Sequence, residues 1–306
     1  MNSVIARIRK NVLESGSATL AISCVLAAQF FFTTQDMAIK WLSGDYALHQ
    51  IILTRAAVGI LFVLAFFVPL EGGYSGLRTR KLGLHLLRGF GIVIANLCFF
   101  TGLITLPLGE ATAIFFVAPL LITALSVLLL GESVGASRWA AVVSGLAGVL
   151  IVLRPREDVF NPAGLLPLGA ALAYALVHIM TRKLGRSEKA STMAFYIQLN
   201  FVVICSIIGI LFGGGEFADP SNPTIDFLFR AWTVPSWSDV LIMLVIGFFS
   251  GLGGYIISQA YRIPEASVVA PFEYAALPLS LFWSITLFSE LPDTLTWMGI
   301  LLIVSG

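Results

Sequence analysis

Long apolar runs separated by short polar segments dominate this chain. Most of the runs reach about 20 residues, the length that crosses the hydrocarbon core of a bilayer. The pattern predicts ten transmembrane helices at residues 19–41, 48–70, 84–106, 110–130, 136–153, 163–184, 191–212, 237–261, 265–288 and 294–306. The fold class that follows is an all-α polytopic membrane protein.

Composition supports this class and excludes others. The chain is 58% hydrophobic and 11% charged, with a mean hydropathy of +0.94. Soluble domains carry about 25% charged residues, so this chain could not cover a soluble surface. A net charge of +1 offers no support for a nucleic-acid partner. The three cysteines lie inside apolar runs without CxxC spacing, which favours packing over metal or disulfide chemistry.

Two stretches of the chain match each other. Residues 110–153, preceded by Gly109, open with EATAIFFVAP, and residues 264–306 open with PEASVVAPFEY. The shared landmarks are Glu110 with Glu265, Glu132 with Glu290, Trp139 with Trp297 and Gly148 with Gly306. The second copy carries three extra residues between the first and second of these landmarks, and the spacing after them is equal. Polar and aromatic landmarks in this arrangement favour a duplication over a coincidence of apolar composition, and internal repeats are common in secondary transporters.

Lysine and arginine residues predict the orientation. With the N-terminus in the cytoplasm, the cytoplasmic side carries the larger set: Arg7, Arg9, Lys10, Arg78, Arg80, Lys81, Arg88, Arg138, Arg182, Lys183, Arg186, Lys189 and Arg262. The opposite side carries only Lys40, Arg154, Arg156 and Arg230. Both termini are therefore predicted to be cytoplasmic.

The orientation also predicts how the two repeats are related. Each repeat holds five helices, an odd number, so the second repeat starts from the opposite side of the membrane. We expect a cytoplasmic N-terminal tail (1–18), a first repeat (19–155) and a second repeat (156–306) that is inverted relative to the first. By comparison with 136–153, the last helix is expected to continue beyond Gly306.

Two ionisable residues near the middle of predicted helices are the first candidates for a functional site, because a charge inside the membrane is costly. Arg55 could attract a substrate carboxylate or form a permanent ion pair that braces the bundle, and the sequence favours neither role. Glu273 follows Pro271, which removes a helical hydrogen bond. Binding an ammonium group or carrying a proton is the favoured role of Glu273; the alternative is a neutral acid hydrogen-bonded to a neighbouring helix.

Asp36 and His178 are the next candidates. Asp36 stands four residues before Lys40, so the two side chains share a helix face and form an internal pair in the favoured interpretation. A cation-recruiting residue at the cavity mouth is the alternative for Asp36. His178 follows Tyr174 by about one turn and titrates near neutrality, as proton coupling requires. A hydrogen-bonded histidine without a coupling role remains the favoured interpretation.

Uncharged polar and aromatic residues complete the predicted binding site. Asn96 and Asn200 lie in the middles of the third and seventh helices. Aromatic rings such as Phe115, Phe116, Tyr255 and Trp283 could clamp a planar or cationic solute. Of these Phe116 is included in the predicted site, together with Tyr174 and Tyr274, which stand beside His178 and Glu273 along the helices. With 23 phenylalanines in the chain, packing is the default for any single one of them.

The sequence contains none of the common catalytic motifs. There is no Walker A sequence, so ATP-driven pumping has no support, and there is no HExxH or Ser/His/Asp motif. No cofactor, metal site or enzymatic activity is therefore expected, and transport would depend on a solute or ion gradient.

At the duplicated stretches the sequence resembles the drug/metabolite transporter superfamily, specifically its EamA-type ten-helix members. The matching features are LPLGEATAIFFVAPLL with Gly131-Glu132, the later PEASVVAPFEY with Glu290, Arg55, and Leu87-Arg88-Gly89 before the third helix. The resemblance covers essentially the whole chain. It implies a bacterial inner-membrane carrier with a central cavity formed mainly by helices other than the fifth and tenth, which would serve in packing or as a homodimer face. The string Ala-Pro-Phe-Glu-Tyr is similar to members labelled as S-adenosylmethionine uptake or amino-acid and amine carriers.

These expectations combine into one hypothesis of function. The chain would be a secondary-active transporter that moves an amino acid, an amine or an S-adenosylmethionine-like solute by alternating access. Arg55 would meet a carboxylate and Glu273 a cationic group, with Pro119 and Pro271 as hinges and a proton as the candidate coupling ion. The alternatives are a channel, against which the scattered polar residues argue, and a membrane-embedded enzyme, for which no nucleophile or metal cluster is visible.

Overall fold

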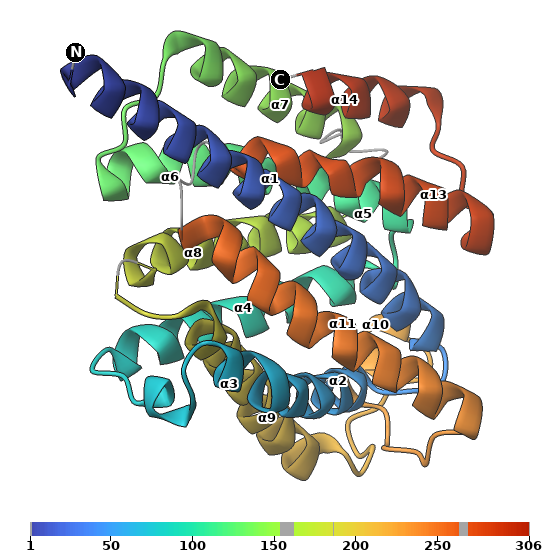
Figure 1. Cartoon of the computed structure of the whole chain (residues 1–306). Helices are drawn as coiled ribbons and strands as arrows, with labels where there is room; N and C mark the ends of the chain where they lie inside the picture. Colours follow the sequence, from blue (N-terminus) through green and yellow to red (C-terminus); the bar gives the residue numbers. More distant parts are fainter. Residues whose placement is uncertain (1, 154–161, 186, 263–268, 306) are drawn as a thin grey trace.

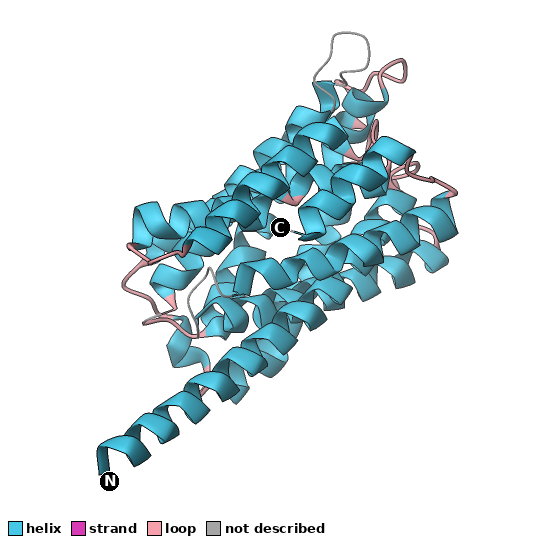
Figure 2. Cartoon of the chain, turned by 90° about the horizontal axis from the view of Figure 1, so that it is seen from above, coloured by secondary structure: helices cyan, strands magenta, loops and turns pink. Residues whose placement is uncertain are grey.

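The structure is a computed structural model that describes residues 2–153, 162–185, 187–262 and 269–305. Within those residues the chain is helical and contains no β-strand (Figure 2). This agrees with the all-α class that the apolar runs predict.

The helices follow the apolar runs closely. The elements before the first gap are α1 (Asn2–Leu42), α2 (Leu48–Phe62), the π-helical η1 (Val63–Phe67), α3 (Val68–Leu70), the 3₁₀ segment η2 (Tyr74–Leu77), α4 (Leu82–Gly102), α5 (Leu108–Phe115), α6 (Val117–Leu130) and α7 (Ala136–Leu153). The later elements are the 3₁₀ segment η3 (Pro162–Gly164), α8 (Leu165–Leu184), α9 (Ala190–Phe212), α10 (Pro223–Phe229), α11 (Trp237–Arg262), the 3₁₀ segment η4 (Ala270–Ala275), α13 (Ala276–Phe288) and α14 (Thr294–Ser305).

Seven helical spans are long and apolar enough to cross a membrane. They are Thr19–Leu42, Leu48–Leu70, Leu82–Gly102, Leu108–Leu130, Pro162–Leu184, Ala190–Phe212 and Trp237–Arg262. The predicted fifth and tenth helices appear as α7 and α14, whose apolar parts are shorter. Residues 265–268 of the predicted ninth helix lie outside the described residues. The chain is thus a multi-pass membrane protein, and the count of ten crossings stays a prediction.

Two features differ from the sequence-based expectation. α1 begins at Asn2, so residues 2–18 are helical and continue the first helix (Figure 2), and their assignment to a cytoplasmic tail stays a prediction. Arg88 was expected before the third helix on the cytoplasmic side, but it lies inside α4 and is only 2% exposed. Counting basic residues along the sequence could not reveal this, because a charge near a helix end can point inward as readily as toward water.

Proline interrupts two helices beside the centre of the bundle. α5 ends at Phe115 and α6 resumes at Val117, because Pro119 has no N–H to offer the carbonyl of Phe115. Pro271 lies in η4, where the backbone is wound as a 3₁₀ helix before α13 begins. The local breaks agree with the positions proposed for hinges, and movement at these points stays a prediction.

The matched stretches also share a backbone conformation. α6 ends at Gly131 with φ 69°, and α13 ends at Ser289 with φ 55°, both in the left-handed region. The glutamate after each cap donates its backbone N–H to the carbonyl oxygen six residues earlier. Glu132 N–H donates to Ser126 O at 3.2 Å, and Glu290 N–H donates to Ser284 O at 3.0 Å. These are the bonds of a Schellman cap. Ser289 adopts the left-handed conformation that favours glycine. The second stretch therefore forms the same cap although it has a serine where the first has Gly131.

α7 and α14 lie side by side at one edge of the bundle (Figure 1). Their backbones meet at glycines: a Cβ placed on Gly148 would lie 2.6 Å from the carbonyl oxygen of Gly299, and one on Gly299 would lie 2.8 Å from that of Gly148. Small residues that allow such close approach are typical of helix contacts in membranes. The two short helices are therefore held together by backbone contact.

We predict that Gly148→Ala separates this contact and lowers the stability of the purified protein by ~1–3 kcal/mol, the usual penalty for overpacking. The measurement is thermal unfolding in detergent. Gly169→Ala in α8 is the matched control, because a Cβ there meets nothing within 4 Å. Equal stability of the two variants would contradict the close packing of α7 against α14.

Candidate functional site

A cavity lies among the long helices. Residues from α1, α2, α4, α5, α8, α9, α11, η4 and α13 line it, and no described residue of α7 or α14 does so. This arrangement agrees with the resemblance, which implies a cavity built by helices other than the fifth and tenth.

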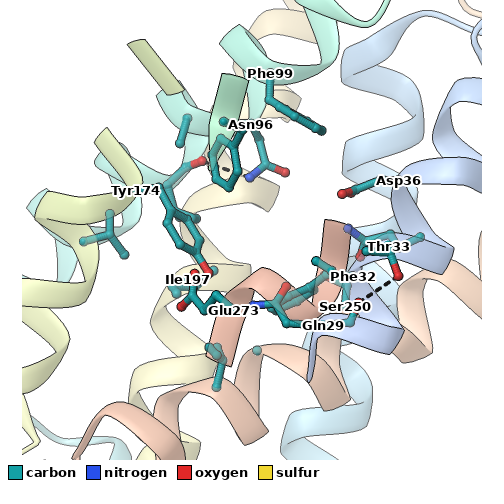
Figure 3. A pocket seen from close by; sticks show the side chains of 18 of the residues that line it. Gln29, Phe32, Thr33, Asp36, Asn96, Phe99, Tyr174, Ile197, Ser250 and Glu273 are labelled. Atoms are coloured by element: carbon teal, nitrogen blue, oxygen red, sulfur yellow. Dashed lines mark hydrogen bonds between the residues drawn. The ribbon is translucent and has the colours of Figure 1, made fainter. Parts of the chain in front are cut away.

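Glu273 forms the acidic end of the cavity and is 2% exposed. Its Oε1 accepts a hydrogen bond of 2.5 Å from the Tyr261 hydroxyl and a longer one of 3.5 Å from the Tyr174 hydroxyl. Gln29 of α1 also hydrogen-bonds Tyr174. Figure 3 shows Gln29, Tyr174 and Glu273 pointing toward one another, with Asp36 apart from them. The carboxyl group is therefore held by phenol donors, and no cation contacts it in the described part of the chain.

His178 lies between the two tyrosines of this cluster. Its ring centroid is 4.2 Å from that of Tyr174 and 4.0 Å from that of Tyr261. The side chain is 3% exposed, and Nδ1 has no hydrogen-bond partner among the described residues. His178 thus supplies an unpaired ring nitrogen close to the acid.

Arg55 forms a second polar centre on α2. It is 2% exposed, and Nη2 donates to Asn96 Oδ1 at 2.8 Å, while its Nε has no hydrogen-bond partner among the described residues. The guanidinium lies over the Phe201 ring at 4.9 Å from the centroid and interacts electrostatically with Asp36. The charge of Arg55 is therefore offset by Asp36 within the protein. This favours the role of an ion pair that braces the helix bundle over that of a binding group for a substrate carboxylate.

α11 approaches α2 closely at the level of Arg55. A Cβ on Gly247 would lie 2.5 Å from Val58 Cβ and 3.0 Å from the Arg55 carbonyl oxygen, and one on Gly251 would lie 2.9 Å from the Gly59 oxygen. Glycines four residues apart let the two backbones meet. The contact fixes the turn that carries Arg55.

The expected internal pair between Asp36 and Lys40 is wrong. Lys40 Nζ contacts Glu290 instead, at 2.7 Å from Oε1. Asp36 lines the cavity and interacts with Arg55. Spacing four apart on a helix permits a pair, but here a carboxylate 250 residues away competes for the lysine.

Arg88 is a cavity residue that the sequence did not single out. Nε donates to Thr181 Oγ1 at 2.7 Å, Nη1 to Met193 O at 2.9 Å and Nη2 to Ser258 Oγ at 3.3 Å. These partners come from α8, α9 and α11, so one guanidinium ties α4 to three other helices. The signals in the sequence were the family-like Leu87-Arg88-Gly89 and the position of Arg88 near the start of an apolar run.

Aromatic rings form one wall of the cavity. Phe99 and Phe115 pack edge to face with centroids 5.2 Å apart, and Phe115 and Tyr174 do so at 5.1 Å. Phe116 lines the same space. The wall is mostly apolar, and it ends at Tyr174, whose hydroxyl donates to Glu273.

Most of the predicted site residues meet at this cavity. Its lining includes Asp36, Arg55, Asn96, Phe116, Tyr174, His178 and Glu273. Asn200 and Tyr274 do not line it. Asn200 donates to Tyr196 O at 2.7 Å and packs against Gly89, while the Tyr274 ring lies 5.4 Å from that of Phe116. Arg88, Ser250 and Tyr261 were missed, because their contribution depends on which way each helix is turned.

The described residues contain no group of three or more His, Cys, Asp or Glu side chains placed to hold a metal ion. The polar groups of the cavity are instead hydrogen-bond donors and acceptors, among them the buried Arg55, Arg88 and Glu273 and the partly buried Asp36. Such a lining suits reversible binding of a small polar molecule.

Comparison with known proteins agrees with this arrangement. The model of the EamA-like transporter family matches residues 19–154. A riboflavin transporter of Vibrio cholerae is 30% identical over 92% of this chain and 89% of its own length. An S-adenosylmethionine uptake transporter of Rickettsia bellii is 24% identical over 94% of this chain and 91% of its own. One solved crystal structure shares the fold, with a TM-score of 0.68 at 19% identity over 95% of this chain and 94% of the other.

These relatives span nearly the whole chain, and they are named as transporters. Together with the multiple apolar helices, they show a membrane transporter rather than an enzyme. The chain belongs to the EamA-like transporter family of the drug/metabolite transporter superfamily.

Proposed function

We propose that this protein is a secondary-active transporter that moves a small metabolite with a planar ring and a polar chain across the bacterial inner membrane by alternating access. The observation that carries the proposal is the pairing of an aromatic wall with a buried hydrogen-bonding cluster in one cavity. The wall of Phe99, Phe115 and Tyr174 suits a flat ring, and Glu273 with its tyrosines suits the polar groups.

Riboflavin is the first candidate solute. Its flat, uncharged ring system would stack on the aromatic wall, and its hydroxylated chain would exchange hydrogen bonds with Gln29, Asn96 and the tyrosine hydroxyls. The name of the Vibrio cholerae relative supports the same choice.

A cationic solute such as S-adenosylmethionine is the second candidate. Glu273 has no cationic partner among the described residues, and a buried carboxylate favours a positive charge. The name of the Rickettsia bellii relative points the same way. In this proposal Glu273 keeps its expected role of binding an amine. Arg55 is a poorer candidate for binding a substrate carboxylate, because it already interacts with Asp36.

Alternating access rests on the proposed inverted repeat of residues 19–155 and 156–306. The matched caps after α6 and α13 and the proline breaks at Pro119 and Pro271 support the relation between the halves. Inverted repeats give a carrier two equivalent ways to close. Cytoplasmic termini and a homodimer remain part of the proposal.

We expect reconstituted protein to accumulate riboflavin, and Phe99→Leu to weaken its apparent affinity roughly 2- to 13-fold, the range for losing an aromatic pair. Radiolabelled uptake into proteoliposomes is the measurement. Phe282→Leu is the control, since Phe282 is 54% exposed on α13. Accumulation of neither riboflavin nor S-adenosylmethionine would overturn both candidate substrates.

Glu273→Gln distinguishes the two candidates. Removing the negative charge is expected to reduce S-adenosylmethionine uptake at least about tenfold, the effect of losing a charged hydrogen bond, and to change riboflavin uptake much less. Glu216→Gln, in the exposed loop before α10, is the control. Equal effects on a charged and a neutral solute would argue against Glu273 as the group that meets a cation.

Proton coupling makes a separate prediction. If Glu273 carries the coupling proton, Glu273→Gln removes the stimulation of uptake by an imposed pH gradient, while His178→Asn retains it. Uptake with and without the gradient is compared in the same vesicles. Retained stimulation in Glu273→Gln together with its loss in His178→Asn would transfer the role to the histidine.

A further inference from the structure

Two glutamates reach across the predicted repeats to a basic residue at the end of a helix. Glu290, just after α13, contacts Lys40 of α1 at 2.7 and 2.9 Å. Its Oε2 also accepts from the Leu108 amide at 3.1 Å and the Ser284 hydroxyl at 3.2 Å. This contact joins the end of α13 to the end of α1 and the start of α5.

The second glutamate, Glu132, follows α6. Its Oε1 lies 3.9 Å from Nε of Arg182 in α8, and Arg182 Nη1 donates to the Arg262 carbonyl at 3.1 Å. The side chains of this pair are 9% and 17% exposed, so it is partly shielded from solvent. Glu132 belongs to the first predicted repeat and Arg182 to the second.

The two pairs occupy equivalent positions. Glu132 and Glu290 follow the matched Schellman caps, and Lys40 and Arg182 each stand two residues before the end of the helix that opens their repeat, Leu42 in α1 and Leu184 in α8. Each pair therefore joins the first helix of one repeat to the fourth of the other. In the inverted arrangement they stand at opposite faces of the membrane.

Each basic residue also stands one turn beyond a residue of the cavity. Lys40 is four residues after Asp36, and Arg182 is four residues after His178; both Asp36 and His178 line the cavity. Residues four apart share one helix face. The two ion pairs thus lie beyond opposite ends of the cavity, on the helix faces that border it.

We propose that Lys40–Glu290 and Arg182–Glu132 are reciprocal latches that close the cavity at its two ends. This rests on the proposed alternating access. Breaking Lys40–Glu290 opens the face that carries the turn between α1 and α2, and breaking Arg182–Glu132 opens the face that carries the loop between α8 and α9. Partly exposed ion pairs are individually weak, so they can break and re-form in each cycle. The Lys40–Glu290 contact, at 2.7 Å, is shorter than the Arg182–Glu132 contact, at 3.9 Å. The end of the cavity at the turn between α1 and α2 is therefore the more firmly closed one.

The test measures access to the cavity from each face without any substrate. Cys24, Cys98 and Cys205 are replaced by alanine, and Thr33, which lines the cavity, by cysteine. A membrane-impermeant maleimide is then added to vesicles of either orientation. The rate of labelling reports the access from the face exposed to the reagent.

Glu290→Gln is expected to raise labelling from the α1–α2 face about two- to fivefold, the range for losing a partly exposed ion pair, and to lower it from the other face. Glu132→Gln is expected to do the reverse. Parent-like thermal unfolding of both variants in detergent controls for misfolding. Glu216→Gln should change neither rate.

Unchanged labelling, or shifts in the same direction for both variants, would overturn the latches. Because the assay needs no solute, it separates this inference from the proposed substrates. Face-dependent labelling without uptake of riboflavin or S-adenosylmethionine would overturn the substrates alone, and uptake without it would overturn the latches alone.

Discussion

The rest of the structure depends on the need to satisfy buried charge inside an apolar bundle. A carboxylate or guanidinium in a membrane is costly unless it finds partners. Here Glu273 is held by Tyr261 and Tyr174, whereas Arg88 is held by groups on three other helices. Each charge thereby fixes the rotation and separation of the helices around it, and together they define the cavity.

Some buried polar groups have a hydrogen-bond partner for every nitrogen or oxygen, and others do not. This difference distinguishes the groups that brace the fold from those that could bind a solute. Every nitrogen of Arg88 donates to the protein, which suits a structural tie. Glu273 is bonded only to neutral phenols, and the Nε of Arg55 and the Nδ1 of His178 have no partner among the described residues. Unused hydrogen-bonding capacity beside an aromatic wall is the feature expected where a polar ligand replaces water.

Much of the fold could be predicted from the sequence, because apolar runs and prolines act locally. Helix positions followed from run length, and the breaks near Pro119 and Pro271 from the missing N–H. Contacts between distant helices could not be predicted. The pairing of Lys40 with Glu290 rather than Asp36 depends on how the bundle closes. The same applies to Asn200 and Tyr274, which have suitable chemistry but do not line the cavity, and to Arg88, which does.

The central claim is that the cavity is exposed alternately to the two sides of the membrane and moves its solute as a carrier. Counterflow tests this most directly. Proteoliposomes loaded with unlabelled riboflavin are diluted into a trace of labelled riboflavin, without any ion gradient. The account predicts that the labelled solute transiently rises inside above its external concentration, because carrier turnover exchanges one molecule for another. Simple equilibration of the label, as through a channel, would contradict it.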